Sequence, residues 1–474
     1  MSLRRTKIIA TLGPATDSPE VMKQLLEEGV NLVRLNFSHG EHAHHKKRID
    51  LVRDVAKTLN KTVGIIADLQ GPKIRIARFR QRKVFLENGD SFTLDANLSK
   101  EGGTEKAVGI DYPELVNDVK VGQTLVLADG LIELLITDVT AHQIITKVTV
   151  GGELSNNKGI NLKGGGLSAA ALTEKDKIDL AFACSQGVDY FAFSFICVKE
   201  DIIEARKLLE SHHSHAGVIA KIERTEAVAN LDEIISVSDA VMVARGDLGV
   251  EIGYPELVAV QKHMIARARA LNKAVITATQ MMESMIQSPI PTRAEVLDVA
   301  NAVIDGTDAV MLSAETATGA HPPRVIASMH QICLGAERQR VTKMSNHRNE
   351  CEFKRIDESI AMAAMYVANH LDIKAIVALT ESGSTPLWMS RIRSGIPIFG
   401  LSRSANSLAK MTLYRGVYPI YFDVTQHDKD RVVRAATDHL LAQDFVSKDD
   451  RIVITLGDVL GVDGQSNSLK IISA

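Results

Sequence analysis

Cysteines are few in this chain and show no paired spacing. Four occur among 474 residues (Cys184, Cys197, Cys333 and Cys351), without a CxxC motif. This usage excludes a small fold held by disulfides and is typical of free or buried thiols in the reducing cytoplasm. We therefore expect a cytoplasmic protein.

Long apolar runs are also lacking. No stretch approaches the ~20 consecutive apolar residues that a membrane-spanning helix needs. The apolar run at residues 6–12 is too short for a signal peptide, and we interpret it as a first buried strand. The sequence predicts no membrane partner.

A strong excess of charge is absent as well. The 55 lysines and arginines nearly balance the 58 aspartates and glutamates, which gives a net charge of -3. Proteins whose main partner is a nucleic acid usually carry a basic excess, so this balance argues against one. The length predicts two or three domains, and a hydrophobic fraction of 45% is enough for sizeable cores.

Buried strands and amphipathic helices alternate over most of the first 340 residues. Near-continuous apolar strands between helices are typical of a parallel sheet that is covered on both faces. Eight such strands favour a (β/α)8 TIM barrel, assigned to residues 1–71 and 168–342. The predicted strands are 6–12, 31–36, 62–68, 188–194, 217–222, 240–244, 274–279 and 309–313. Helices are expected at 41–59, 201–211, 255–271 and 292–305, among others.

The alternation breaks once, at residues 72–167. Period-two patterns surround Asn-Gly, Gly-Asp and Asp-Gly turns there, which predicts a small inserted β-barrel domain. Gly151 and Gly152, and the glycines at 164–166, are candidate hinges for it.

A second α/β pattern follows a polar stretch near residue 343. Strands are predicted at 375–380, 397–402, 417–422 and 451–455, with a helix at 357–371. We expect residues 343–474 to form a separate, doubly wound α/β domain.

Polar residues recur where the predicted barrel strands end, which is where barrel enzymes place their active sites. A purely structural barrel needs no such convergence, although each residue alone could be a salt bridge or a cap. They are Arg34, Asn36, Ser38, His39, Asp68, Ser194, Lys221, Glu223, Arg245, Gly246, Asp247, Thr279, Gln280, Ser313 and Glu315.

Lys221 and Glu223 are two residues apart, so they point to the same side of an extended strand. One interpretation is a buried ion pair. The other is a lysine that neutralises a transferring phosphoryl group beside a carboxylate that holds a metal, with Asp247 as the second ligand. Two carboxylates plus water and substrate oxygens suit Mg²⁺, and Mn²⁺ accepts similar ligands.

Nine motifs, in this order along the chain, resemble the pyruvate kinase family. They are TKIIATLGPAT, VRLNFSHG, DLQGPKIR, NNKGIN, KIE, ARGDLGVEI, TATQMMESM, PTRAEVLDVANAV and DGTDAVMLSAETA. The resemblance implies phosphoryl transfer from phosphoenolpyruvate to ADP, giving pyruvate and ATP, in the last step of glycolysis. It also implies a homotetramer that answers to a phosphorylated allosteric activator.

The resemblance also implies a role for each matching residue. Arg34 would bind the phosphoryl group, Lys221 would stabilise the transition state, and Thr279 would contact the substrate near the carbon that is protonated. Glu223 and Asp247 would hold Mg²⁺, and the amides of Gly246 and Asp247 would bind the substrate carboxylate. The residues expected to face the nucleotide are Asn36, His39, Arg75 and Lys158.

One motif departs from the pattern common in potassium-dependent members, DTKGPEIRT. Here Leu69 replaces a threonine that would ligate potassium, and Lys73 replaces a glutamate. Asn36, Ser38 and Asp68 still resemble the other cation ligands. We hypothesise that the Lys73 ammonium supplies the missing charge, so that K⁺ is not required.

The loop at residues 380–385 follows a predicted strand and precedes a predicted helix, a place that suits a phosphate. Members of the family activated by fructose 1,6-bisphosphate often carry a basic residue where Glu381 stands. A carboxylate there should repel a second phosphate, which predicts activation by a sugar or nucleotide monophosphate. The expected site residues are Thr380, Ser382, Ser384, Thr385, Ser402 and Arg403.

Two other functions stay open at this point. The metal pair alone also permits a Mg²⁺-dependent lyase or aldolase that stabilises an enolate. The 380–385 loop alone permits a non-catalytic sugar-phosphate sensor.

Overall fold

Eight parallel strands close into a barrel in the computed structural model, which describes residues 3–343 and 352–474. Neighbouring strands follow the chain order, and the last strand pairs with the first. The predicted barrel is confirmed, although most strands end one or two residues inside the predicted limits. The strands are β1 (Lys7–Thr11), β2 (Leu32–Asn36), β3 (Gly64–Asp68), β12 (Tyr190–Phe193), β13 (Gly217–Ile222), β14 (Ala240–Ala244), β15 (Ala274–Ala278) and β16 (Ala309–Leu312).

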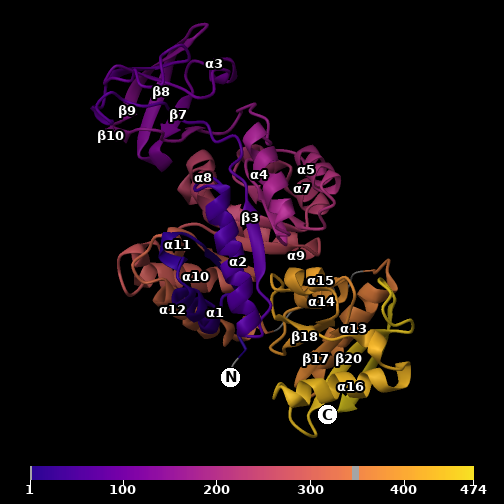
Figure 1. The fold of residues 1–474 in the computed structure, drawn as a ribbon. Coiled ribbons are helices and arrows are strands. Elements are labelled where there is room, and N and C mark those ends of the chain that lie inside the picture. Colours follow the sequence, from indigo (N-terminus) through magenta and orange to yellow (C-terminus); the bar gives the residue numbers. More distant parts are fainter. Residues whose placement is uncertain (1–2, 344–351) are drawn as a thin grey trace.

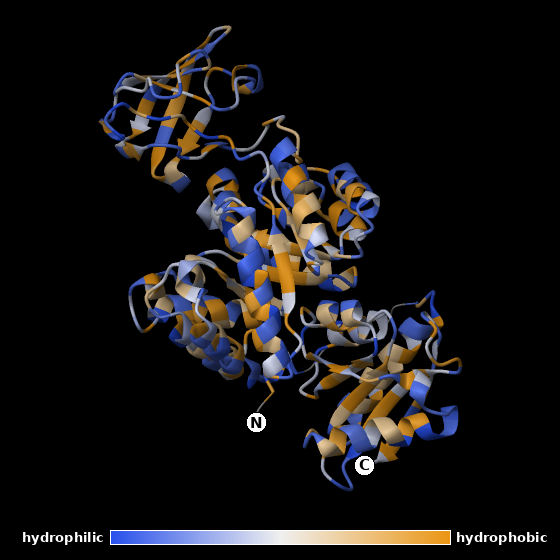
Figure 2. Ribbon diagram, in the orientation of Figure 1, coloured by the Kyte–Doolittle hydropathy of each residue, from blue (hydrophilic) through white to orange (hydrophobic). Residues whose placement is uncertain are grey.

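Successive residues of each barrel strand enter different apolar cores. In β13, Val218 and Ala220 pack in the layer between strands and helices, whereas Ile219 packs in the second core, which includes residues from inside the barrel. Figure 2 shows the apolar strands beneath helices whose outer sides are polar. The covering helices include α1 (Pro19–Glu28), α2 (His42–Thr58), α4 (Glu174–Ser185), α5 (Lys199–Ser211), α7 (Leu231–Val237), α9 (Tyr254–Ala270), α10 (Arg293–Asp305) and α12 (Pro322–Glu337). Shorter helices at the loops are α6 (Thr225–Ala229), α8 (Arg245–Ile252) and α11 (Ala314–Ala317).

A separate β body, which we call the lid, is inserted between β3 and α4 (Figure 1). It has its own apolar core, a two-stranded sheet and a six-stranded sheet. Its elements are β4 (Lys83–Leu86), β5 (Ser91–Asp95), β6 (Ala107–Gly109), α3 (Leu115–Asp118), β7 (Thr124–Leu127), β8 (Ile132–Val139), β9 (Gln143–Val150), β10 (Gly152–Ser155) and β11 (Ile160–Leu162).

The glycines flanking the lid differ in what they do. Gly164, Gly165 and Gly166 all have a positive φ where the chain returns to the barrel, a conformation that glycine adopts without strain. The hinge at these residues stays a prediction. The predicted hinge at Gly151 and Gly152 is wrong, because both residues lie inside the lid. Gly151 separates β9 from β10, and Gly152 is the first residue of β10.

The C-terminal region forms a five-stranded sheet with helices on both faces. Helix α16 packs in one apolar core and α13 in the other, which confirms a doubly wound arrangement. The edge strand β21 is antiparallel to β20 and was not predicted. The elements are α13 (Ile356–His370), β17 (Ala375–Leu379), α14 (Ser384–Arg391), β18 (Ile398–Ser402), α15 (Ala405–Met411), β19 (Val417–Tyr421), α16 (Lys429–Ala442), β20 (Arg451–Gly457) and β21 (Ser466–Ser473). In the described part of the chain, no helix combines the length and apolar character needed to cross a membrane.

Candidate active site

The barrel alternation carries polar side chains into the interior at the strand ends. In β13, the side chain of Ile219 packs in the second core, inside the barrel. Lys221, two residues further along the strand, therefore points to the same side. By the same count, Leu32 places Arg34 and Ile66 places Asp68 on the inside of β2 and β3. The sequence prediction that these groups converge at one end of the barrel is therefore met by their contacts.

Lys221 is the centre of this polar layer. Its Nζ lies 2.9 Å from Oε1 of Glu223 and 3.2 Å from Oδ1 of Asp68, and it donates to Oγ of Ser194 at 2.7 Å. Arg34 Nε donates to Oδ2 of Asp68 at 2.6 Å. Two cations thus share the carboxylate of Asp68.

Burial and charge act against each other on these groups. Burial alone would raise the pKa of Asp68, but Arg34 and Lys221 outweigh it and lower that pKa. Burial alone would lower the pKa of Lys221, but Asp68 and Glu223 raise it well above its usual value. Both groups are therefore charged at neutral pH, and Lys221 acts here as a fixed cation rather than as a proton donor.

Glu223 is a carboxylate of this layer whose charged form is disfavoured, since its pKa is raised. Burial raises its pKa, Lys221 lowers it, and the nearby Asp247 raises it further. Its Oε2 accepts a hydrogen bond of 2.8 Å from the backbone N–H of Phe195. A divalent cation would stabilise the charged form of Glu223 beside Asp247, and the hard oxygens of the two carboxylates suit Mg²⁺.

Among the described residues, no group of three or more His, Cys, Asp or Glu side chains is arranged to hold a metal. A pair of carboxylates is nevertheless sufficient for Mg²⁺, which keeps several waters and takes further oxygens from substrate phosphates. The donor set of Glu223 and Asp247 therefore fits that ion.

Lys73 reaches the second of these carboxylates from the segment that leads into the lid. Its Nζ lies 2.9 Å from Oδ1 of Asp247, and both side chains are about one-fifth exposed. The sequence hypothesis places a positive charge near the candidate metal site, and the ammonium of Lys73 lies there. The other predicted cation ligands are engaged otherwise, since Asn36 Oδ1 accepts from the Ser38 amide at 3.1 Å and Asp68 pairs with Arg34 and Lys221.

Thr279 and the start of α8 contact each other. The Gly246 N–H donates to Oγ1 of Thr279 at 2.9 Å. Thr279 and Gln280 have φ values of 65° and 53°, a conformation that is costly for a β-branched residue and is concentrated at functional sites. Two groups expected to contact the substrate are thus adjacent, and the backbone that presents Thr279 is strained.

Arg245 holds this strained turn in place, a role that the sequence did not reveal. Its guanidinium donates to the carbonyl oxygens of Ala278 and Thr279 and to both carboxylate oxygens of Asp298, each of the latter at 2.8 Å. Phe195, with a φ of 57°, plays a comparable part by turning its amide toward Glu223. Neither contact has a signal in the sequence, because each depends on which loops meet in space.

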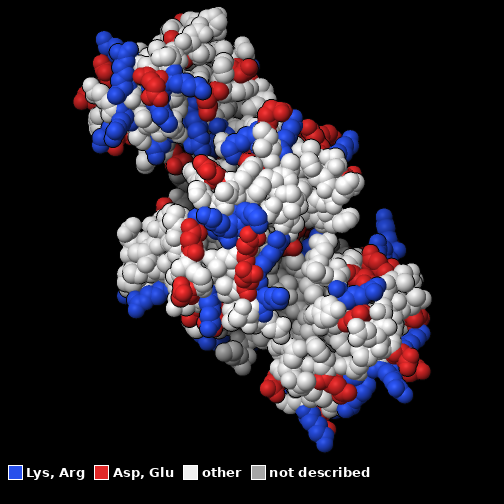
Figure 3. Space-filling model, viewed as in Figure 1, with Lys and Arg blue, Asp and Glu red and all other residues white. Residues whose placement is uncertain are grey.

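The four residues expected at the nucleotide lie on both sides of the junction with the lid. Asn36 is the last residue of β2 and His39 follows that strand, whereas Arg75 and Lys158 lie on lid segments that pair with each other near the junction. Burial lowers the pKa of His39, and the nearby cations Arg75 and Arg34 lower it further. Figure 3 shows Lys and Arg side chains gathered on the lid and where it meets the barrel.

The predicted activator residues are far from the barrel mouth, in the C-terminal region. Thr380, Ser382, Ser384 and Thr385 line a small cavity together with the loop before β21. Glu381 also lines it and lies 3.3 Å from Nε of Arg403. Ser402 is buried and accepts the Ser404 amide instead, so it is not part of the lining.

Comparison with known proteins agrees with this architecture. The family model described as "Pyruvate kinase, barrel domain" matches residues 3–326, and "Pyruvate kinase, alpha/beta domain" matches residues 358–472. "Pyruvate kinase II" of Salmonella typhimurium is 53% identical over 477 residues, covering 99% of each chain. "Pyruvate kinase" of Haemophilus influenzae is 53% identical over 459 residues, covering 96% of each chain. "Pyruvate kinase" of Geobacillus stearothermophilus is 40% identical over 472 residues, which is 99% of this chain and 80% of that one.

Proposed function

The chain belongs to the pyruvate kinase family, and from that premise we propose that its barrel site transfers the phosphoryl group of phosphoenolpyruvate to ADP, giving pyruvate and ATP. The observation that carries this proposal is Lys221, a buried cation held between Asp68 and Glu223 beside Arg34. Phosphoryl transfer depends mostly on positioning and electrostatics, so fixed cations around the non-bridging oxygens are what it requires.

The charged layer acts on the phosphoryl end of the substrate. Arg34 and Lys221 contact the phosphoryl oxygens, and because both are anchored by Asp68 they need little reorganisation as charge develops. Glu223 and Asp247 would hold Mg²⁺, or Mn²⁺ in its place, which when bound neutralises charge on the phosphoryl and enolate oxygens.

The start of α8 acts on the carboxylate end of the substrate. The amides of Gly246 and Asp247 bind the substrate carboxylate, which takes the place of the Thr279 hydroxyl at the Gly246 N–H. The released hydroxyl of Thr279 then lies beside the carbon that needs a proton and positions it, with water, for delivery.

The nucleotide binds at the junction with the lid, between Asn36 and His39 on one side and Arg75 and Lys158 on the other. Closure of the lid brings the cations of Arg75 and Lys158 onto the phosphates and excludes water, which limits hydrolysis.

One coupled assay tests the reaction and its alternatives. Formation of ATP from phosphoenolpyruvate and ADP with Mg²⁺ is expected from the purified chain. Cleavage or condensation of an enolate substrate without nucleotide would favour a lyase or aldolase. Binding of a sugar phosphate without any turnover would favour a sensor and refute the proposed reaction.

We further propose that K⁺ is not required. The support is the Lys73 ammonium at 2.9 Å from Asp247, together with the buried Leu69, which has no oxygen to offer a cation. A fixed charge at this point removes the need for a mobile one.

Replacement of Lys73 tests this idea directly. We expect equal wild-type rates with K⁺ and with tetramethylammonium, and K⁺-dependent activity in Lys73→Glu. Lys83→Glu is a control, because Lys83 is an exposed lid residue paired with Glu153. Strict K⁺ dependence of the wild type would refute the proposal.

Activation by a sugar or nucleotide monophosphate is the regulatory part of the proposal. The cavity next to α14 presents several hydroxyls, and Glu381 already neutralises Arg403. A single phosphate finds hydrogen-bond donors there, whereas a second phosphate would meet the carboxylate of Glu381.

Titration at subsaturating phosphoenolpyruvate separates the two activator classes. Ribose 5-phosphate and AMP are expected to activate, and fructose 1,6-bisphosphate is not. Ser384→Ala should weaken activation, whereas Ser359→Ala, on the exposed side of α13, should not. Equal activation by the bisphosphate would contradict the role given to Glu381.

The remaining proposals concern organisation. We propose the domain limits 1–71 with 168–342, 72–167 and 343–474, and a cytoplasmic homotetramer. Exposed Ile356 and Tyr366 on α13 and Ile471 on β21 give the C-terminal region apolar surface for subunit contacts. Light scattering after size exclusion tests the tetramer, and a monomeric mass would refute it.

A further inference from the structure

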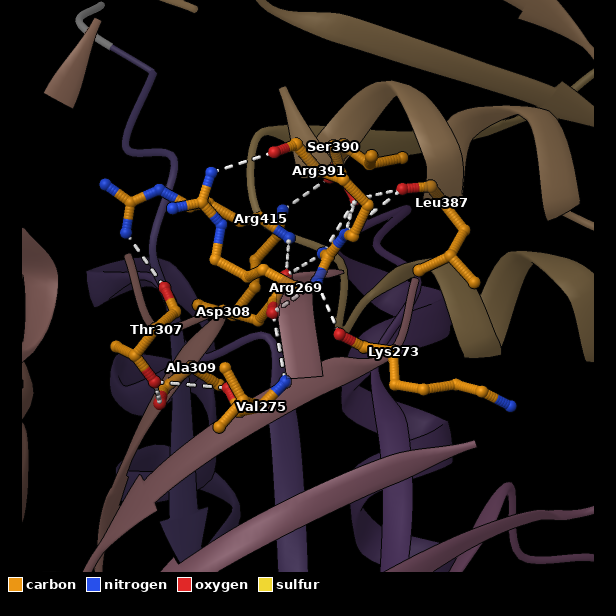
Figure 4. A network of polar contacts seen from close by, with 12 residues as sticks. Arg269, Lys273, Val275, Thr307, Asp308, Ala309, Leu387, Ser390, Arg391 and Arg415 are labelled. Carbon is orange, nitrogen blue, oxygen red and sulfur yellow. Dashed lines mark hydrogen bonds and ion pairs between the residues drawn. The ribbon is translucent and has the colours of Figure 1, made fainter. Parts of the chain in front are cut away.

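Five arginines converge where the N-terminal ends of β15 and β16 meet the C-terminal region. They are Arg5, Arg269, Arg391, Arg393 and Arg415, and Figure 4 shows three of them around Asp308. This is the end of the barrel opposite to Lys221, so the cluster has no part in the proposed reaction.

Two of the five are balanced by carboxylates. Arg391 forms a buried ion pair with Asp308, each with 1% of its side chain exposed. Arg5 Nε lies 3.6 Å from Oε2 of Glu337. The first pair joins the barrel to the C-terminal region, whereas the second lies within the barrel. Among the described residues, the other three guanidinium groups have no acidic partner.

In the described part of the chain, the guanidinium groups of the other three donate only to backbone carbonyl oxygens. Arg269 donates to the Arg391 carbonyl and Arg415 to the Thr307 carbonyl, each at 2.8 Å. Arg393 donates to the carbonyls of Ile304, Asp305 and Val341. Among the described residues none of the three forms an ion pair, so carbonyl dipoles are the only compensation for these charges.

The electrostatic result is a partly buried excess of positive charge. Burial and then Arg393, Arg391 and Arg415 lower the pKa of Arg269 to about 9. Burial also lowers the pKa of Arg393 and of Arg415. Burying a cation without a counter-ion is costly, so the site favours any anion that can enter.

A small cavity lies between the two parts, lined by four of these arginines and by Gly306, Ser394 and Gly416. Arg269 and Arg415 extend in the same direction from the Arg391–Asp308 pair in Figure 4. Each uses one side-chain N–H group for the protein, so Nε and another terminal nitrogen of each have no partner among the described residues.

We propose that this cavity binds a small oxyanion of the inorganic phosphate or sulfate type, bridged by Arg269 of the barrel and Arg415 of the C-terminal region. Two guanidinium forks match the oxygens of a tetrahedral anion and give charge-assisted hydrogen bonds. The described lining contains no aromatic side chain on which a base could stack. A free oxyanion therefore fits better than a nucleotide.

Binding of inorganic phosphate tests this site in the full-length enzyme. In a chloride-poor, phosphate-free buffer, added phosphate should raise the melting temperature of the wild type. Arg269→Gln should weaken that response about tenfold or more, since it removes a charged hydrogen-bonding partner. It should also melt no lower than the wild type without phosphate, because it relieves uncompensated charge.

Controls separate this site from the others that take phosphate. Arg267→Gln, on the same helix but paired with exposed Asp232, should respond like the wild type. Phosphate bound at the barrel mouth or beside α14 would act equally on all three proteins. Ribose 5-phosphate should show no difference between the wild type and Arg269→Gln.

A purely structural role predicts another pattern. Arg269→Gln would then melt lower by the same amount with and without phosphate. That result, or equal phosphate responses of the wild type and Arg269→Gln, would overturn the proposal. If Arg269→Gln does not fold, Arg415→Gln serves for the same comparison.

Discussion

Glu251 is a buried carboxylate of α8, 2% exposed, next to the point where the lid rejoins the barrel. Its backbone oxygen accepts the Gly164 N–H at 3.1 Å, and its Oε2 accepts the Thr225 N–H at 3.0 Å. Burial, with the nearby carboxylates of Glu226 and Asp247, raises its pKa from 4.5 to about 7. We predict that Glu251→Gln stabilises the protein at alkaline pH.

The sign follows from the two protonation states. Because the folded pKa lies above the unfolded one, the folded state holds a proton on Glu251 that the unfolded state releases between pH 4.5 and 7. Stability therefore falls as the pH rises through that window. The difference between a pKa of about 7 and one of 4.5 corresponds to roughly 3 kcal/mol of destabilisation of the folded state. This destabilisation is present at pH 8 and absent near pH 4.5.

Glutamine imitates the protonated form. Its oxygen can still accept from Thr225, and its amide can donate to Oε2 of Glu226, which is buried and has no partner among the described residues. Thermal denaturation at pH 8 and pH 5 should show a rise of a few °C for Glu251→Gln at pH 8 and little change at pH 5. The exposed Glu256→Gln should be neutral at both. An equal shift at the two pH values, or a loss at pH 8, would refute the reasoning.

Two further predictions concern buried ion pairs. Lys221→Met should lower turnover by about a thousandfold or more in the ATP assay, because it removes the fixed cation beside the phosphoryl group; circular dichroism should show an intact fold, and near-wild-type activity would contradict its role. Asp308→Asn should cost about 3–5 kcal/mol in thermal denaturation, since it leaves Arg391 buried without a counter-ion; the exposed Asp372→Asn is its control, and equal stability of the two variants would contradict the estimate.

Much of the fold was predictable because the barrel strands are buried on both sides. Runs such as residues 240–244 read as continuous apolar segments, and the predicted strand coincides with β14. The errors lie at strand ends, where polar residues such as Thr279 take up turn conformations that a local pattern does not specify. Strand β21 was missed because much of it is exposed at an edge, so its residues show no clean alternation.

The candidate site was predictable in its chemistry and less so in its contacts. Period two places Lys221 and Glu223 on one side of β13, and parallel strands bring Arg34 and Asp68 to the same end. The contact of Lys73 with Asp247 joins residues 174 positions apart and depends on how the lid segment leaves the barrel. The orientation of the Phe195 amide and the clamp made by Arg245 depend equally on tertiary placement.

Buried cations are neutralised differently at the two ends of the barrel. At the mouth, Arg34 and Lys221 are matched by Asp68 and Glu223, so the cations are stable before any substrate arrives. At the opposite end, the guanidinium groups of Arg269 and Arg415 donate only to carbonyl oxygens among the described residues. At a catalytic site, charges that are fixed before the substrate binds avoid the cost of reorganisation during the reaction. At the junction between the barrel and the C-terminal region, the positive charge is left for an added anion to neutralise. An anion bound there would therefore link the barrel to the region that carries the proposed activator site, without touching either ligand.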